Sequence, residues 1–304
     1  MNPEGQSAPS PAPPSDAFGS GGVLPPISRA LLFLILVFLF WIFLPGAVSH
    51  FAPNLRSREQ LALLYALLGA AVLVASALLI RALDRRSFRT IGLWFYPGWW
   101  KELACGIGIG AALIGLVAAI LVVLGAIRYS GLTGPPKEML PGFEVTAGIL
   151  FLAAAFEELA FRGYGFQRLV EAFGALGAVV VFSGLFGVVH LLNPWATMLS
   201  TASTALSGVL LSVAYLKTRA LWLPVGLHWA WNFFMGPVLS LPISGLDFGP
   251  TLLRVQISGA TWLTGGDYGP EGGVVVIAVV LVAIVFLVRT RRLATSPAME
   301  EALK

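Results

Sequence analysis

Two carboxylates and a guanidinium interrupt an apolar stretch of the chain, in the run Phe156-Glu157-Glu158-Leu159-Ala160-Phe161-Arg162. The residues that precede it, 148–155, are all apolar or small. On insertion scales, one charged side chain at the centre of a membrane-spanning helix costs roughly 2.5–3.5 kcal/mol. Three such side chains together therefore indicate a functional site rather than ordinary membrane-helix sequence.

The spacing of the three charged residues divides them into two roles. Glu158 and Arg162 are four residues apart, so a helix places them on one face, acid first, which favours an ion pair. Glu157 is turned about 100° away and is free to face another element. We therefore predict that Glu158 and Arg162 form a supporting ion pair and that Glu157 is the chemical carboxylate.

Further polar residues within apolar runs show the same four-residue spacing. Phe186 lies directly beneath His190 on a helix, and His228 shares a face with Asn232. With Glu157, the two histidines and the asparagine are the candidate catalytic residues. Phe186 is expected to support His190.

A helical hairpin would bring these residues to one depth. The midpoint between Glu157 and His190 falls at residues 173–174, in a turn-like Glu-Ala-Phe-Gly sequence. A turn there places both side chains about 24 Å from a tip that projects into the cytoplasm, and the site in the cytoplasmic half of the bilayer. At that depth the second helix either continues beyond Asn193-Pro194 or ends early.

A glutamate and two histidines that converge in a membrane suit hydrolysis, because a carboxylate in apolar surroundings is a strong base for water. Two arrangements fit the residues. Glu157, His190 and His228 could bind Zn²⁺ together with one water. Alternatively, Glu157 and His190 activate water while His228 and Asn232 donate hydrogen bonds to an oxyanion. A single membrane histidine often serves only to join helices, but the whole set favours a catalytic site.

Composition indicates the class of protein that must position this site. Of the 304 residues, 57% are hydrophobic and only 11% are charged, whereas soluble domains carry about a quarter charged residues. The chain is therefore expected to be an all-α, polytopic membrane bundle. Its net charge of +4 comes from short loops between apolar runs, which does not indicate nucleic-acid binding. The single cysteine, Cys105, excludes an intrachain disulfide and is expected to be a small core residue.

Apolar runs long enough to span a bilayer predict about eight helices and four regions. Residues 1–27 are expected to form a disordered cytoplasmic tail, 28–144 hold helices 1–3, and 145–240 hold helices 4–7, the core that carries the polar residues. Residues 241–304 hold an extracytoplasmic loop, helix 8 and a basic C-terminal tail. The expected spans are residues 30–48, 61–80, 103–127, 145–166, from 175 past 190, 197–215, 221–239 and 274–288.

The loop charges predict orientation in the cell membrane. One set of connections holds Arg85, Arg168 and Lys217, and the C-terminal tail adds further arginines, whereas the opposite set is mixed or acidic. The positive-inside rule places the first set and both termini in the cytoplasm. Gly106, Gly108 and Gly110 lie within an apolar helix with no preceding strand, so we expect them to allow close helix packing rather than phosphate binding.

The three motifs resemble those of a known family, the CPBP membrane proteases. This family includes CAAX prenyl endopeptidases of the Ras-converting type and the bacteriocin-processing Abi proteins. Its patterns Glu-Glu-x-x-x-Arg, Phe-x-x-x-His and His-x-x-x-Asn/Asp occur here in order, within residues 145–235. The resemblance implies an intramembrane endopeptidase, classed with metalloproteases, that acts on a peptide or membrane-protein substrate, including lipidated ones.

The resemblance also implies roles for individual residues and leaves alternatives. Glu157 would activate water with His190, while His228 and Asn232 would bind a metal or the oxyanion. Many bacterial relatives have no known prenylated substrate, so prenylation is not inferred. The alternatives are a catalytically silent scaffold or immunity protein, and a proton-coupled transporter. Against the transporter, the polar residues gather at one depth and no inverted repeat is visible.

Overall fold

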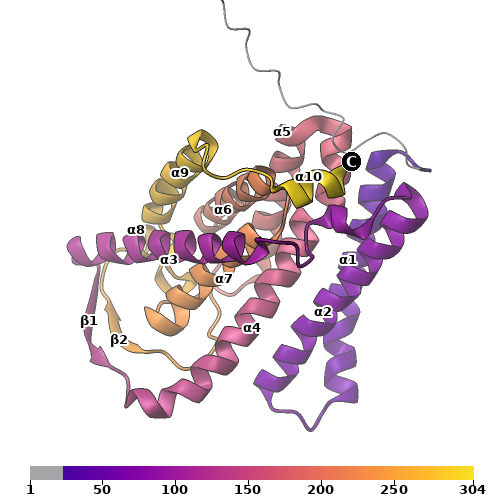
Figure 1. Cartoon of the computed structure of the whole chain (residues 1–304). Helices are drawn as coiled ribbons and strands as arrows, with labels where there is room; N and C mark the ends of the chain where they lie inside the picture. Colours follow the sequence, from indigo (N-terminus) through magenta and orange to yellow (C-terminus); the bar gives the residue numbers. More distant parts are fainter. Residues whose placement is uncertain (1–22) are drawn as a thin grey trace, which may run out of the picture.

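The computed structural model of the chain describes residues 23–304 as a bundle of helices, and this confirms the predicted all-α membrane bundle (Figure 1). Residues 1–22 of the expected tail lie outside the described residues, and the first helix begins at the end of that tail. The helices are α1 Pro26–Phe51, α2 Ser57–Leu79, α3 Trp99–Val123, α4 Pro136–Arg162, α5 Tyr164–Val189, α6 Met198–Thr218, α7 Trp222–Phe233, α8 Thr261–Thr264, α9 Val274–Arg289 and α10 Pro297–Leu303.

Each of the eight predicted spans overlaps one helix, α1 to α7 or α9, with ends that differ by several residues in α4, α5 and α7. Within residues 23–304, five helical segments are long and apolar enough to cross a membrane by length and composition. One of them, Lys137–Leu192, contains both α4 and α5, while α9 is a shorter apolar helix. The segments are Pro26–Phe51, Ser57–Asp84, Trp99–Val123, Lys137–Leu192 and Met198–Thr218. These segments make the chain a multi-pass membrane protein.

Two glycines shape the connection from α4 to the second half of α5. Gly163 leaves helical geometry, with ψ −132°, so α4 ends at Arg162 rather than near residue 166. Gly174 interrupts α5 with φ 72° and ψ 175°, a conformation that glycine adopts without the strain of a side chain. The turn predicted at residues 173–174 is therefore present. The helix after this turn is expected either to continue beyond Asn193-Pro194 or to end early. It ends early, because α5 stops at Val189.

A buried network of four charges packs the turn of α5 against α1 and the end of α2. Arg29 binds Asp84 and also Glu171, the latter at 3.1 Å. Arg168 binds Asp84 at 3.2 Å and Glu171 at 3.0 Å. All four side chains are almost entirely shielded from solvent. The charged residues of this tip therefore pair with one another inside the protein.

Both described ends of the chain lie at this same end of the bundle (Figure 1). The backbone N–H of Val23 donates to the carbonyl of Leu83 at 2.9 Å. Met299 of α10 is fully buried and accepts a hydrogen bond from the indole of Trp94.

Close packing of α3 against α7 depends on two of the three glycines singled out in the sequence. A Cβ added at Gly106 would lie 2.2 Å from the carbonyl oxygen of Leu223, and one at Gly110 would lie 2.3 Å from that of Leu227. Gly108 has no neighbour within 4 Å. The packing role is thus confirmed for Gly106 and Gly110 and does not apply to Gly108.

A matched pair of substitutions tests this helix contact. We expect Gly110→Ala to lower the free energy of unfolding by about 1–3 kcal/mol, because its methyl group would overlap backbone that can only move by separating the helices. Gly108→Ala, on the same helix, should leave stability unchanged or slightly raised. Thermal unfolding in one detergent compares the two variants, and equal unfolding temperatures would contradict the proposed contact.

The core consists of two large groups of buried side chains and a small third one. The first large group comes mainly from α1, α2, α4 and α5, and the second mainly from α3, α6, α7 and α9. The small group holds Tyr96, Ala220, Trp222 and Met299. Phe161 of α4 packs against both large groups, so the polar stretch of α4 lies where they meet.

A small sheet, which the sequence analysis did not predict, joins two loops. Strand β1, Ile127–Leu132, pairs antiparallel with β2, Leu253–Ile257, with Ile127 opposite Ile257 and an irregularity between Tyr129 and Leu132. The sheet ties the segment after α3 to the long loop before α9. The expectation that Cys105 is a core residue is wrong, because its side chain is exposed on α3.

Candidate active site

The predicted ion pair of α4 is present and is fully buried. Arg162 Nη1 lies 3.1 Å from Glu158 Oε1, and both side chains have no exposed surface. Arg162 also donates to the carbonyl of Gly208 at 2.9 Å and to Ser212 Oγ at 3.4 Å, both on α6. The guanidinium therefore neutralises Glu158 and connects α4 to α6.

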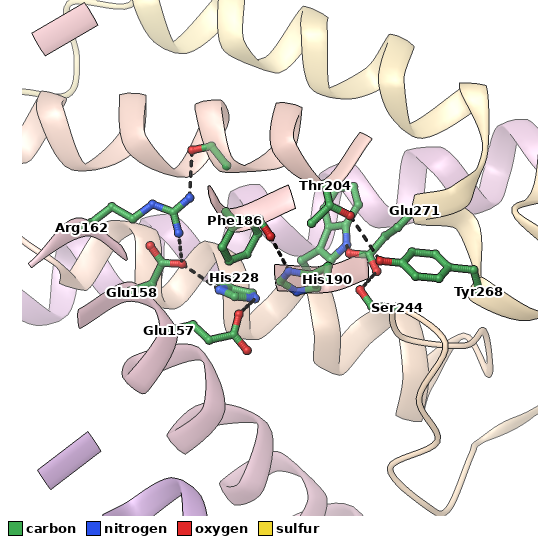
Figure 2. A network of polar contacts seen from close by, with 12 residues as sticks. Glu157, Glu158, Arg162, Phe186, His190, Thr204, His228, Ser244, Tyr268 and Glu271 are labelled. Carbon is green, nitrogen blue, oxygen red and sulfur yellow. Dashed lines mark hydrogen bonds and ion pairs between the residues drawn. The ribbon is translucent and has the colours of Figure 1, made fainter. Parts of the chain in front are cut away.

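His228 of α7 lies between the two adjacent glutamates (Figure 2). Its Nδ1 is 2.8 Å from Glu158 Oε1, and its Nε2 is 3.8 Å from Glu157 Oε2. A carboxylate paired with an arginine only accepts hydrogen bonds, so Nδ1 of His228 carries a proton. Glu158 thus orients the imidazole as well as pairing with Arg162, a second role that the sequence analysis did not assign.

His190 occupies a different part of the site from the one expected. It lies just after the end of α5, in the short turn His190–Leu192. Its Nδ1 donates to the carbonyl of Phe186 at 2.6 Å, which leaves Nε2 without a proton in the neutral ring. Among the described residues, no carboxylate oxygen lies within 4.0 Å of His190. The imidazole in contact with Glu157 is therefore that of His228.

Phe186 packs between the two histidines. Its ring centroid is 4.6 Å from that of His190 and 6.0 Å from that of His228. The Arg162 guanidinium lies 4.7 Å from the same ring. The side chain expected to support His190 thus contacts both imidazoles and the ion pair.

One cavity of about 680 Å³ brings the candidate catalytic residues together. Glu157, His190, His228 and Asn232 all line it, from α4, the end of α5 and α7. Most of the remaining wall is apolar and comes from α1, α4, α5, α6 and the loop around residue 246. The arrangement places a carboxylate, two imidazoles and an amide around a space large enough for a peptide segment.

Residues 142–234 match the family model described as type II CAAX prenyl endopeptidase Rce1-like. The chain carries an Rce1-like domain. It extends from within α4 to just past the end of α7 and contains all four candidate catalytic residues. The match confirms the resemblance to CAAX proteases over these residues. Searches of curated proteins and of solved structures found no match.

A second polar cluster lies at the cavity, centred on Glu271 and Ser244, which are outside the matched residues. Glu271, in the turn before α9, accepts a hydrogen bond from Trp231 Nε1 at 3.0 Å and another from Ser244 Oγ. Close by, the hydroxyl oxygens of Tyr268 and Thr204 are 3.4 Å apart. The sequence analysis missed this cluster, because a glutamate in a glycine-rich loop carries no local sign of reaching a cavity.

Glu157, His190 and His228, the residues expected to bind zinc, line the cavity together. Among residues 23–304, no three His, Cys, Asp or Glu side chains form a group that could hold a metal ion. Glu157 Oε2 and His228 Nε2 are 3.8 Å apart, and the hydrogen bond from His190 Nδ1 to the carbonyl of Phe186 leaves Nε2 as the free nitrogen of that ring.

Proposed function

We propose that the chain is an intramembrane endopeptidase that hydrolyses a peptide bond in the cavity of its Rce1-like domain. The observation that carries the proposal is the convergence of Glu157, His190, His228 and Asn232 on one cavity. Its apolar walls suit a hydrophobic peptide, a transmembrane segment or a lipidated peptide that enters from the bilayer. The substrate is thus a peptide or membrane protein.

The charges around His228 support an imidazolium in the resting site. Glu157 and Glu158 contribute two negative charges, and Arg162 contributes one positive charge. A proton on both nitrogens of His228 balances the group, and isolated charge in an apolar interior is strongly disfavoured. In this state Nδ1 donates to Glu158, while Nε2 carries a proton that it can donate within the cavity.

The proposed reaction uses these groups in two steps. Glu157 takes a proton from a water molecule that also donates to the unprotonated Nε2 of His190, and the water oxygen attacks the carbonyl carbon. The oxyanion that forms accepts hydrogen bonds from His228 Nε2 and the amide of Asn232. Glu157 then returns the proton to the leaving nitrogen, the C–N bond breaks, and a carboxylic acid and an amine result.

A comparison of protein termini in the native host tests this proposal. Cells with the wild-type protein, Glu157→Ala or Cys105→Ala would be compared by sequencing the C-termini of membrane proteins. Cys105 is exposed on α3 and does not line the cavity, so this variant is the matched control. We expect new termini with wild type and Cys105→Ala that are absent with Glu157→Ala. If a phenotype persists without any changed terminus, the chain is a silent scaffold or immunity protein instead.

Removal of metal ions tests the alternative zinc scheme. We expect cleavage by the purified protein to survive exhaustive chelation, because the proposed base and oxyanion donors are all side chains. Metal content would be measured on the same sample to show that chelation was complete. Activity that is lost on chelation and restored by Zn²⁺ would instead assign Glu157, His190 and His228 as ligands.

We further propose that both termini face the cytoplasm and that cleavage takes place near that face. The arginines and lysines near the turn of α5 and at the C-terminal end of α9 support this orientation under the positive-inside rule. Ser296→Cys in a Cys105→Ala background places a single cysteine in the C-terminal segment. It should not react with a membrane-impermeant maleimide in intact cells, but it should react once the cells are broken so that the reagent reaches the cytoplasmic face. Labelling of intact cells would reverse the assignment.

A further inference from the structure

Glu271 is a second carboxylate of the substrate cavity, and it lies away from the proposed catalytic base. In Figure 2, Glu157 and Glu271 lie on opposite sides of His190, and both residues line the same cavity. Glu271 follows β2 in the chain, in the turn that leads into α9. It therefore lies outside residues 142–234, the part of the chain that matches the Rce1-like family model.

The hydrogen bonds of Glu271 hold its carboxylate in place without neutralising it. Each oxygen accepts one hydrogen bond from a neutral group, the indole of Trp231 or the hydroxyl of Ser244. A carboxylate offers about four acceptor positions, so about two remain for a ligand. The side chain is half-buried and faces the cavity with its orientation already determined.

Glu271 differs from three other buried acids, Glu158, Asp84 and Glu171, in having no basic partner within residues 23–304. Glu158, Asp84 and Glu171 each bind an arginine. Among the described residues, no basic nitrogen lies within 4.0 Å of Glu271. An ionisable side chain in largely apolar surroundings that lacks a countercharge is expected to bind one from a ligand or substrate.

The wall beside Glu271 further defines the ligand. Ser244 is flanked in the cavity lining by Ile243, Leu246 and Phe248. Lysine and arginine side chains combine an apolar stem with a cationic end, and this combination matches an apolar wall that ends in a carboxylate. A small inorganic cation would leave the apolar wall without contacts.

We propose that Glu271 is a specificity-determining residue that binds the ammonium or guanidinium group of a lysine or arginine in the substrate peptide. The inference rests on the proposed peptidase function and extends it to a class of substrate. The peptide would pass His190 so that its scissile bond lies at Glu157 and its cationic side chain at Glu271. A charge-assisted hydrogen bond to the carboxylate would then set the register of the peptide.

A binding assay tests the proposal separately from cleavage. The probes are a fluorescent leucine- and alanine-rich peptide with one central lysine and the same peptide with that lysine acetylated. Affinities would be measured by anisotropy with full-length protein in nanodiscs, after subtraction of empty nanodiscs. We expect wild type to prefer the lysine peptide by about tenfold, and Glu271→Gln to remove this preference while it binds the acetylated peptide normally.

Two further variants show whether the effect comes from charge at this position. Asp267→Asn removes a carboxylate from the same loop, outside the cavity lining, and should keep the tenfold preference. Ser244→Ala removes one of the two hydrogen bonds that orient the carboxylate but leaves its charge, and it should reduce the preference without removing it. Thermal unfolding would show that each variant is folded.

The outcomes separate this inference from the proposed function. No preference in wild type, an unchanged preference in Glu271→Gln, or equal loss of both peptides in that variant would each overturn the inference. The absence of a preference in wild type would overturn the inference even if Glu271→Gln fails to fold. A Glu271-dependent preference in a protein that cleaves neither peptide, and no native substrate, would support the cation site and refute the peptidase.

Discussion

Replacing Glu157 with glutamine is expected to reduce peptide cleavage by about 10²–10⁴-fold, the range over which positioned general bases contribute. Glutamine keeps the size of the side chain and its place on α4, but it cannot take a proton from water. The substrate found by sequencing termini would be used with purified protein, and single-turnover rates would be compared. Binding of the substrate should change little, because the loss is in proton transfer.

The same variant should remain folded, and this separates a chemical role from a structural one. Oε2 of Glu157 has no hydrogen-bond partner among the described residues, and its nearest charged neighbour, His228 Nε2, is 3.8 Å away. We therefore expect a change in unfolding free energy of less than about 1 kcal/mol. Glu144→Gln, an exposed position on the same helix, is the control. Retained cleavage by Glu157→Gln would show that another group activates the water.

Replacing Glu158 with glutamine is expected to lower stability strongly, whereas Glu157→Gln mainly lowers the rate of cleavage. The guanidinium of Arg162 is fully buried, and removal of one partner from a buried pair typically costs about 3–5 kcal/mol. The imidazole of His228 also loses the carboxylate that holds its Nδ1 proton at 2.8 Å. Thermal unfolding should therefore shift strongly to lower temperature, and activity should fall as His228 loses its orientation.

A double variant distinguishes these two roles of Glu158. In Glu158→Leu with Arg162→Met, both charges disappear and apolar side chains of similar size replace them. Stability should recover relative to Glu158→Gln, because no buried charge is left unpaired, while cleavage should remain low, because His228 still lacks its acceptor. Recovery of both stability and cleavage would show that Glu158 acts only as the ion-pair partner of Arg162. A destabilised Glu157→Gln beside a stable Glu158→Gln would reverse our assignment of the two glutamates.

Much of the site could be predicted because its spacing lies within single helices. The four-residue interval between Glu158 and Arg162 determines that they meet on one face, whatever surrounds the helix. The turn at Gly174 followed from a short glycine-containing sequence midway between Glu157 and His190. The membrane bundle itself followed from apolar runs, since only a helix satisfies its own backbone hydrogen bonds in lipid.

Relations between helices could not be predicted, because they depend on how each helix is rotated and shifted against its neighbours. The contact of Glu157 with His228 rather than His190 is one result, and so is the second hydrogen bond of Glu158. The exposed position of Cys105 is another, since an apolar sequence looks alike on the lipid and protein sides of a membrane helix.

Glu157 and Glu158 show which contacts are determined by the sequence alone and which are determined by the tertiary structure. Sequence spacing alone determined that one of them pairs with Arg162 and that the other points elsewhere, because 3.6 residues per turn is a local property of the backbone. Only the tertiary structure decided that His228 lies between them and that Glu271 reaches the same cavity from a distant loop. Those contacts join segments far apart in the chain, and no local periodicity encodes them.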